Sequence, residues 1–138
     1  MFDRCLYFNT NHLSRIVGKI WVDAFAPLGL APAHAYLLRL VLKKPGLLQK
    51  EIGEQLHLEK STITRFVDKM VKQGYLIRQS SVVENVKYQH IFATTKAKNI
   101  AEKLEETGDE LYKKMQQAIN IEDLTALVNT MRNLTAKL

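Results

Sequence analysis

Four side chains between residues 62 and 72 combine hydrogen-bonding and cationic groups at helical spacing. At about 100° per residue they fall on one side of a helix, with Ser61 and Asp68 flanking them: Thr62, Arg65, Lys69 and Lys72. Short hydroxyl side chains hydrogen-bond to base edges, while Arg and Lys bind guanine and phosphate oxygens. This arrangement, with hydroxyls near the N-terminus and cations further along, is typical of a helix that enters the major groove of DNA.

The opposite side of the same segment is apolar. Its residues recur at i, i+3, i+4, i+7 and i+8, as in a helix packed on a core: Ile63, Phe66, Val67, Met70 and Val71. Before it, Ile52 and Leu56 share one side of a shorter helix, and Leu58 closes a turn after His57. We therefore predict a helix-turn-helix within residues 47–70. The alternative is a plain helical hairpin with a solvated outer face.

Basic charge is concentrated around this motif. The 138-residue chain has 20 basic and 14 acidic side chains, a formal net charge of +6. Residues 43–98 hold eleven basic and five acidic side chains, a net of +6, whereas residues 1–42 hold +2 and residues 99–138 hold −2. Phosphate binding requires such a local excess. A mildly basic solvated surface is the alternative that charge alone leaves open.

Length and composition bound the class of protein. A chain of 138 residues fits one domain with a substantial core. It has no run of eighteen apolar residues, its N-terminus lacks the pattern of a secretory signal, and the single Cys5 excludes an internal disulfide. We therefore expect a cytoplasmic protein with no membrane partner.

No group of residues has the spacing of a catalytic or metal site. The four histidines share no ligand spacing and are interpreted as surface or interface residues: His12, His34, His57 and His90. The acidic run 102–110 is interpreted as the solvated face of a helix. A glycine-rich phosphate loop and a nucleophile elbow are both absent from the sequence. We expect neither an enzyme nor a bound cofactor or metal.

Further helices must position the motif. Apolar residues at helical spacing predict a first helix over about residues 9–26, which Pro27 ends. Pro32 suits the first turn of a second helix over about residues 32–43. Gly74 is expected to end the recognition helix as a C-terminal cap.

After Gly74 the hydrophobic pattern is no longer helical. Residues 75–81 and 87–93 are short and rich in β-branched and aromatic side chains, and the turn-prone pair Glu84-Asn85 lies between them. They predict a β-hairpin. A helix-turn-helix followed at once by such a hairpin is a winged helix.

Two helices are expected after the hairpin. Thr94 or Thr95 should cap a long helix to about residue 118, along which apolar or small residues recur at alternating steps of three and four. A last helix over about residues 122–137 also has one apolar face.

The predicted fold class is mainly α with a small β-hairpin wing. We expect a single domain over residues 1–138, with the winged helix-turn-helix over about residues 32–98. Apolar faces at both ends of the chain predict dimerisation helices over about residues 5–27 and 95–138. The alternative is that these terminal helices fold back on their own subunit.

The order of elements and the residues together resemble the MarR family of bacterial transcription regulators. The resemblance covers essentially the full chain and is carried by LGLAPAHAYLLRLV (28–41), QKEIGEQLHLEKSTITRFVDKMVKQGYLIR (49–78) and ATTKAK (93–98). It implies a homodimer that binds a pseudo-palindromic operator in double-stranded DNA. It also implies a repressor that releases DNA when a small phenolic or anionic effector, or an oxidant, reaches the dimer.

The resemblance assigns roles to individual residues. It implies base contacts from four of them, namely Ser61, Thr62, Thr64 and Arg65. Lys60 and Lys69 would contact the DNA backbone, and the outward cation Lys72 joins this set. The wing departs from the family pattern, because VVENVK stands where an Asp-Arg-Arg-like element is usual and Lys87 is the nearby cation. We therefore expect few phosphate contacts from the wing.

Cys5 is a candidate redox sensor. It lies near the start of the first helix, as does the reactive cysteine of the family's organic-hydroperoxide-sensing branch, and oxidation would make a small group larger and polar. However, Asn9 and Lys19 occupy the spacings of the tyrosine pair that assists that cysteine. The alternative, which we favour, is a small apolar interface residue.

Two other classes of function remain open from the sequence. One is a winged-helix module whose recognition face binds protein, although such modules usually lose the cations that this chain keeps at Arg65, Lys69 and Lys72. The other is a ligand or redox sensor with weak DNA binding, which the depleted wing permits.

Overall fold

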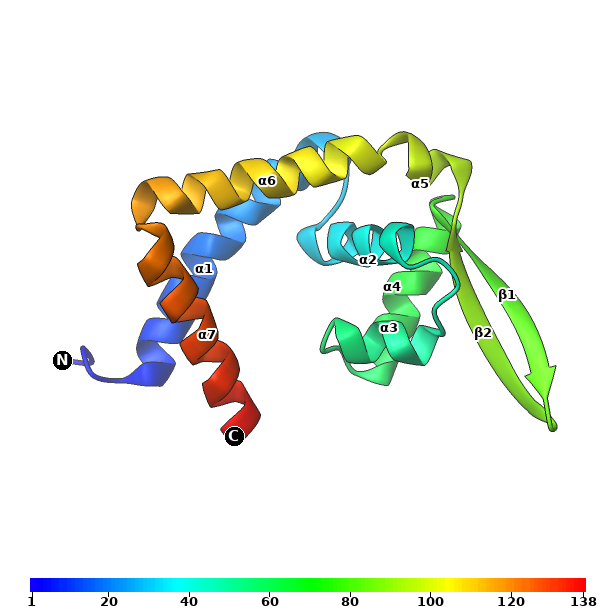
Figure 1. The fold of residues 1–138 in the computed structure, drawn as a ribbon, viewed down its shortest axis with the longest axis horizontal. Helices are drawn as coiled ribbons and strands as arrows, with labels where there is room; N and C mark the ends of the chain where they lie inside the picture. Colours follow the sequence, from blue (N-terminus) through cyan, green and yellow to red (C-terminus); the bar gives the residue numbers. More distant parts are fainter. The chain divides into compact units, whose positions relative to one another are not determined.

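The computed structural model describes residues 1–138 (Figure 1). In chain order its elements are α1 (Leu6–Phe25), η1 (Ala26–Leu28), α2 (Pro32–Lys43), α3 (Gln49–Gln55), α4 (Lys60–Lys72), β1 (Leu76–Val83), β2 (Val86–Ala93), α5 (Thr95–Asn99), α6 (Ala101–Ala118) and α7 (Ile121–Lys137). The chain divides into two compact units, Met1–Glu105 and Glu106–Leu138. The predicted fold class is confirmed: the chain is mainly helical, with one two-stranded antiparallel hairpin.

Helix starts follow local signals in the sequence. α1 begins after Cys5, whose Sγ accepts a hydrogen bond from the amide three residues later at 3.5 Å, so it starts before the predicted residue 9. α2 covers the predicted span, with Pro32 in its first turn. At α3 the N-cap Leu48 has no side-chain acceptor, and Glu51 Oε1 instead accepts from the Leu48 amide at 3.1 Å.

The prediction of one continuous helix over residues 95–118 is wrong. Thr94 caps its start as expected, accepting a hydrogen bond from the Ala97 amide at 3.3 Å. The helix breaks at Ile100, whose ψ of 3° is far from the helical value and whose amide donates to the Ala97 carbonyl three residues back. Asn99 and the β-branched Ile100 both have low helix propensity. The apolar spacing continues through the break, so the sequence pattern gave no sign of it.

The core of the first unit lies where α2, α3 and α4 meet the base of the hairpin (Figure 1). α1 contributes one fully buried side chain, Phe25. The predicted apolar stripe of α4 is confirmed, because Ile63, Val67 and Met70 are buried. The other large side chains of this unit that are fully buried are Leu37, Leu38, Val41, Ile52, Leu76, Ile91 and Leu104.

The helix-turn-helix is closely packed at Gly53. A Cβ atom at this position would lie 3.2 Å from Ile63 Cγ2 and 3.4 Å from the Leu58 carbonyl oxygen. In the turn, His57 has a φ of 56°, and the Leu58 amide donates to the Gly53 carbonyl at 2.9 Å. The absence of a side chain at Gly53 therefore lets the two helices approach.

A polar and aromatic cluster joins α1, α2 and the N-terminal part of α6. Trp21 Nε1 donates to Tyr36 Oη at 3.0 Å, and the Arg39 guanidinium lies 5.1 Å from the centroid of the Tyr36 ring. Arg39 also donates to both carboxylate oxygens of Glu105, at 2.9 and 3.1 Å. Hydrogen bonding to Glu105 raises the pKa of Arg39 and lowers the pKa of the Glu105 carboxyl. Both groups are therefore held in their charged forms.

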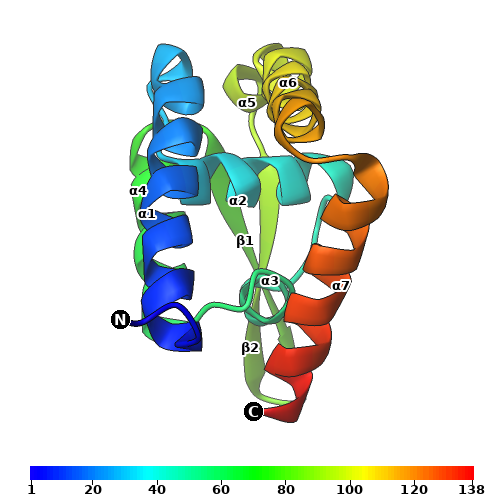
Figure 2. The same ribbon diagram turned by 90° about the vertical axis from the view of Figure 1, so that its left-hand side faces the viewer.

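β1 and β2 pair in register from Leu76↔Ala93 to Val83↔Val86, and Figure 2 shows them side by side along their length. The predicted hairpin is confirmed, although its strands reach further toward the tip than expected. The turn consists of Glu84 and Asn85, with φ values of 50° and 65°. Positive φ at both positions is the signature of a type I′ turn, which matches the twist of the strands.

The loop before α3 holds the outer edge of β2. The Gly46 amide donates to the Ile91 carbonyl at 3.0 Å, and the Ile91 amide donates to the Leu47 carbonyl at 2.9 Å. His90 Nδ1 donates to the Gly46 carbonyl at 3.0 Å, while its Nε2 lies 3.0 Å from Ser81 Oγ. The outer edge of β1 has no partner strand.

Two histidines are structural. His34 is only 8% exposed, and its ring meets Phe66 of α4 edge to face at 4.8 Å between centroids. His90 is half-buried in the hydrogen bonds just described. The interpretation of all four histidines as surface or interface residues is therefore wrong for His34, which is buried, whereas His90 is only partly buried. Burial, and to a smaller extent Lys69, lower the pKa of His34, so its neutral form is favoured.

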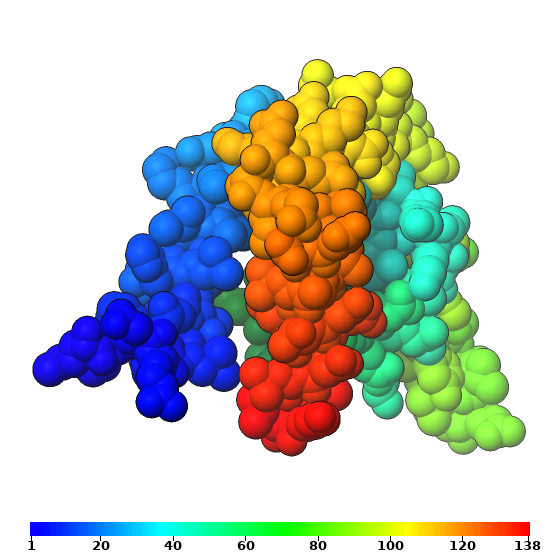
Figure 3. Space-filling view, turned by 60° about the vertical axis from the view of Figure 1, so that its left-hand side comes forward, coloured from blue at the N-terminus to red at the C-terminus, as the bar shows by residue number.

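The second unit contains α7, and none of the side chains of this helix is buried. Asn120 caps α7, because its Oδ1 accepts from the Asp123 amide at 2.9 Å. Its exposed apolar residues are Ile121, Leu127, Val128, Met131 and Leu134. Figure 3 shows the surface of α7 in orange and red.

α1, in the first unit, also has an extensive apolar surface, drawn in blue in Figure 3. Its exposed apolar residues are Leu6, Tyr7, Phe8, Leu13, Ile16 and Val22. No single helix is long and apolar enough to span a membrane. Residues 6–28 and 32–43 together have the length and apolar composition of a membrane span, with a 64° bend between them. However, five residues of α2 are buried in the protein core.

Candidate nucleic-acid interface

The outer face of α4 is polar and free of acidic partners. Arg65, Lys69 and Lys72 are exposed, and no salt bridge in the structure involves them. Ser61 is exposed in the first turn, and the neighbouring Thr62 is half-buried. These side chains therefore form an outward hydrogen-bonding and cationic surface opposite the buried stripe.

The C-terminal end of α4 is fixed by a glycine cap. Gly74 has a φ of 83°, and the Tyr75 amide donates to the Met70 carbonyl at 2.9 Å, a Schellman arrangement. Lys96 Nζ donates to the Gln73 carbonyl at 2.6 Å and lies 4.3 Å from the centroid of the Tyr75 ring. The predicted cap at Gly74 is confirmed, and Lys96 ties the residues after the wing to the end of α4.

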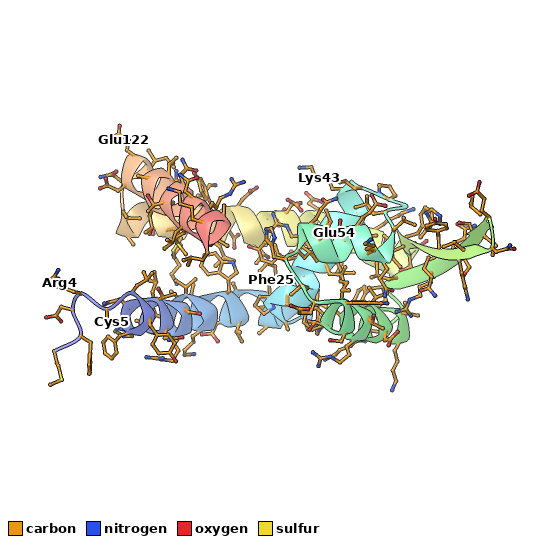
Figure 4. All side chains as sticks on the ribbon, turned by 90° about the horizontal axis from the view of Figure 1, so that it is seen from below. Arg4, Cys5, Phe25, Lys43, Glu54 and Glu122 are labelled. Carbon is orange, nitrogen blue, oxygen red and sulfur yellow. The ribbon has the colours of Figure 1, made fainter.

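A basic groove lies between the helix-turn-helix and the wing. It has a volume of about 920 Å³ and is lined by residues of α3, α4, β1 and β2. Lys50 from α3, Lys60 from α4 and Lys87 from β2 line it, and none of them makes an ion pair. Two acidic residues also line it, of which Asp68 is paired with Arg78 and Glu54 of α3 is unpaired (Figure 4). The groove therefore has an excess of positive charge.

Thr64 has hydrogen-bond partners inside the protein. Its hydroxyl donates to the Lys60 carbonyl at 2.8 Å and accepts from Gln49 Nε2 at 3.1 Å. Gln49 Oε1 accepts from Arg78 Nε at 3.1 Å, and Arg78 Nη2 lies 2.6 Å from Asp68 Oδ1. The resemblance implies a base contact for Thr64, yet its half-buried hydroxyl is used in this network.

Sequence reasoning missed three residues of this region: Gln49, Lys50 and Arg78. Lys50 lies on the helix that precedes the one expected to enter the major groove. Gln49 and Arg78 are 29 residues apart, and no local pattern links them. The signal that could have found Lys50 is its position, because it is the second residue of α3, the first helix of the helix-turn-helix.

Cys5 lies at the N-terminus of α1, next to Arg4 (Figure 4). It is half-buried and is a free cysteine. Asn9 Nδ2 donates to the Cys5 carbonyl at 2.8 Å and to the Phe2 carbonyl at 3.2 Å, so backbone carbonyls on both sides of Arg4 are hydrogen-bonded to α1.

These elements define the class of protein: a winged helix-turn-helix with an outward basic recognition face. Residues 28–83 match the model of the MarR family. The resemblance to the MarR family that the sequence suggested is thereby confirmed. This match covers the helix-turn-helix and the first strand of the wing.

A curated relative and solved structures agree with this result. The relative, "Uncharacterized HTH-type transcriptional regulator YybA" of Bacillus subtilis (strain 168), is 25% identical over 97 residues, which are 70% of this chain. The matched residues are 64% of that relative, so the chain spans less than two thirds of its length.

Two solved structures share this fold and were determined with a bound molecule. The transcriptional repressor CouR, bound to a 23-mer DNA duplex, has a TM-score of 0.86 and 17% identity, covering 97% of this chain and 94% of CouR. The transcriptional regulator PcaV from Streptomyces coelicolor, in complex with its natural ligand, has a TM-score of 0.79 and 16% identity, covering 99% of this chain and 95% of PcaV. At these identities the likeness establishes the fold.

Proposed function

We propose that this protein is a sequence-specific DNA-binding transcriptional regulator that acts as a homodimeric repressor. The outward face of α4 carries this proposal, because three cations without acidic partners stand there beside a serine and a threonine. The fold shared with DNA-bound CouR supports it further. α4 would enter the major groove, with Ser61, Thr62 and Arg65 toward base edges and Lys69 and Lys72 toward phosphates.

The experiment is selection of duplexes from a random library of roughly 30 base pairs, followed by binding measurements. We expect the wild-type protein to enrich an inverted repeat with half-site centres about 34 Å apart. Arg65→Ala should lose roughly 1–3 kcal/mol of specific binding and relax the preference at one position in each half-site. Enrichment of no sequence by the wild-type protein would overturn the proposal. An unchanged preference in Arg65→Ala would overturn the base contact alone.

The proposed homodimer rests on the apolar surfaces of α1 and α7. Each helix has a row of exposed apolar side chains that a second copy of the chain could cover. A polar substitution in the middle of α7, Met131→Glu, should weaken the dimer and the affinity for an inverted repeat together. Light scattering after size-exclusion chromatography measures the first, and fluorescence anisotropy measures the second. A wild-type monomer that binds a single half-site as tightly as the inverted repeat would contradict this.

Release of DNA would require a signal. A small phenolic or anionic effector is one proposal, supported by the ligand-bound neighbour PcaV. Oxidation of Cys5 is a second, which its half-buried position and its place in the N-cap of α1 allow. Treating the DNA complex with a stoichiometric organic hydroperoxide, with Cys5→Ser as control, tests the second proposal. Release from wild type alone would assign the oxidant, and unchanged binding in both would leave Cys5 structural.

A further inference from the structure

Arg78, in the first strand of the wing, contacts both helices of the helix-turn-helix. Its Nε donates to Gln49 Oε1 on α3 at 3.1 Å. Its Nη2 lies 2.6 Å from Asp68 Oδ1 and 3.5 Å from the Thr64 carbonyl oxygen, both on α4. The Arg78 side chain is 23% exposed. Because the guanidinium is a rigid planar fork of donors, it can satisfy these acceptors only when β1, α3 and α4 hold fixed relative positions.

The hydrogen bonds beyond Arg78 run in one direction. Arg78 can only donate, so Gln49 must face it with its carbonyl oxygen and present its amide nitrogen to Thr64. Thr64 accepts that hydrogen and donates its own to the Lys60 carbonyl at 2.8 Å. Gln49 and Thr64 each act as both donor and acceptor, so the bonds polarise one another and reinforce a single arrangement.

This series of hydrogen bonds ends in the part of α4 that would face DNA. Thr64 lies between Thr62 and Arg65, and its hydroxyl proton is already donated to the Lys60 carbonyl. It therefore has no hydrogen left for a base acceptor. Ser61 and Arg65 are exposed and make no such internal bonds.

We propose that Arg78 is a positioning residue for sequence recognition. Acting through Gln49 and Thr64, it sets the orientation in which the first turns of α4 present Ser61, Thr62 and Arg65 to base edges. Thr64 then belongs to the positioning network and is not itself a base-reading residue. The inference rests on the proposed DNA-binding function.

A direct phosphate contact by Arg78 is the competing explanation. Arg78 is paired with Asp68 at 2.6 Å, so its charge is already balanced within the protein. Arg78 lines the same groove as Lys60 and Lys87, but these two lysines are exposed and have no acidic partner, so they are better placed for phosphates. The two explanations predict different salt dependences, because only a phosphate contact releases a counterion from DNA.

The test is a double-mutant cycle on the full-length protein. The probes are a duplex selected by the wild-type protein from a random library and an unrelated duplex of equal length. The quantity is the specificity ratio, the affinity for the first divided by the affinity for the second. We expect Arg78→Gln to lower it on the order of tenfold and Thr64→Val to lower it as well. We expect the double variant to be no worse than Arg78→Gln alone, because both changes break one series of hydrogen bonds.

Two further variants separate positioning from folding and from charge. Thr64→Ser keeps the hydroxyl and should restore the wild-type specificity ratio. Arg78→Lys keeps the charge but lacks the fork, so it should lose specificity while the slope of log affinity against log salt stays unchanged. Thermal unfolding tests whether each variant is folded. If Arg78→Gln does not fold, Arg78→Lys takes its place in the double-mutant cycle.

Three results would overturn the inference. One is multiplicative losses in the double variant, which would mean independent roles for Arg78 and Thr64. Another is a wild-type specificity ratio in Arg78→Lys. The third is a salt slope reduced by about 0.9 per subunit in Arg78→Gln, as the loss of a phosphate contact requires. If the wild-type protein selects no sequence at all, the proposed function itself has failed, which is a separate and recognisable outcome.

Discussion

Gly53→Ala tests the close packing of the two helices of the helix-turn-helix. The new Cβ would lie 3.2 Å from Ile63 Cγ2 and 3.4 Å from the Leu58 carbonyl oxygen. Carbon atoms normally pack at about 3.5–4.0 Å, so α3 and α4 must separate by a few tenths of an ångström. Ile63 is buried and the Leu58 oxygen belongs to the backbone of the turn, so neither can rotate away.

Two opposing effects set the magnitude. Overpacking costs about 1–3 kcal/mol, whereas the higher helix propensity of Ala recovers up to about 1 kcal/mol. We expect net destabilisation of about 1 kcal/mol and a Tm lower by roughly 3–6 °C. Because Ile63 belongs to α4, operator affinity should fall as well.

The assay is thermal unfolding followed by circular dichroism at one fixed protein concentration, since self-association makes Tm depend on concentration. Gly18→Ala is the matched control, because Gly18 lies within α1 and a Cβ atom added there would have nothing within 4 Å. Within one chain only the helix propensity of Ala acts at this position, so Tm should rise, provided that light scattering shows the same self-association as for wild type. A Tm for Gly53→Ala equal to or above that of wild type would refute the packing argument.

Three further predictions concern charge, pH and the wing. Lys50→Ala should weaken binding to all duplexes alike and reduce the salt slope by about 0.9 per subunit, and an unchanged slope would remove Lys50 from the interface. The pKa of His34 is lowered in the folded state. The wild-type free energy of unfolding should therefore fall, relative to that of His34→Gln, as pH decreases through about 6.5. Parallel pH profiles of chemical denaturation for the two proteins would contradict this. Asn85→Gly should slow amide hydrogen exchange across the hairpin, because glycine accepts positive φ without strain, whereas faster exchange would argue against the type I′ turn.

Elements with strong local signals could be predicted from the sequence. The apolar stripe of α4, the proline in the first turn of α2 and the glycine cap at Gly74 each depend on residues within a turn or two of one another. The hairpin followed from β-branched strands around Glu84 and Asn85. The break at Ile100 was missed because apolar spacing continues on both sides of it.

Some features of the candidate site could also be predicted from the sequence, and others could not. Exposure of Arg65, Lys69 and Lys72 follows from helical periodicity alone. Occupation of the Thr64 hydroxyl could not be foreseen, because it depends on Gln49 from another helix. Hydrogen bonds between distant residues depend on the tertiary fold, which local periodicity does not specify.

The unequal edges of the wing have a consequence for handling the protein. The outer edge of β2 is covered by the loop at Gly46, but the outer edge of β1 is open along LIRQSSVV. This strand has neither proline nor lysine, the residues that commonly prevent a strand edge from pairing with another chain, and Val82 and Val83 near its end are exposed. In concentrated solution, aggregation by strand addition should therefore begin at β1. Val83→Lys would be the first change to make for soluble, crystallisable material, because Val83 is exposed and pairs with Val86, whereas Val82 pairs with Lys87.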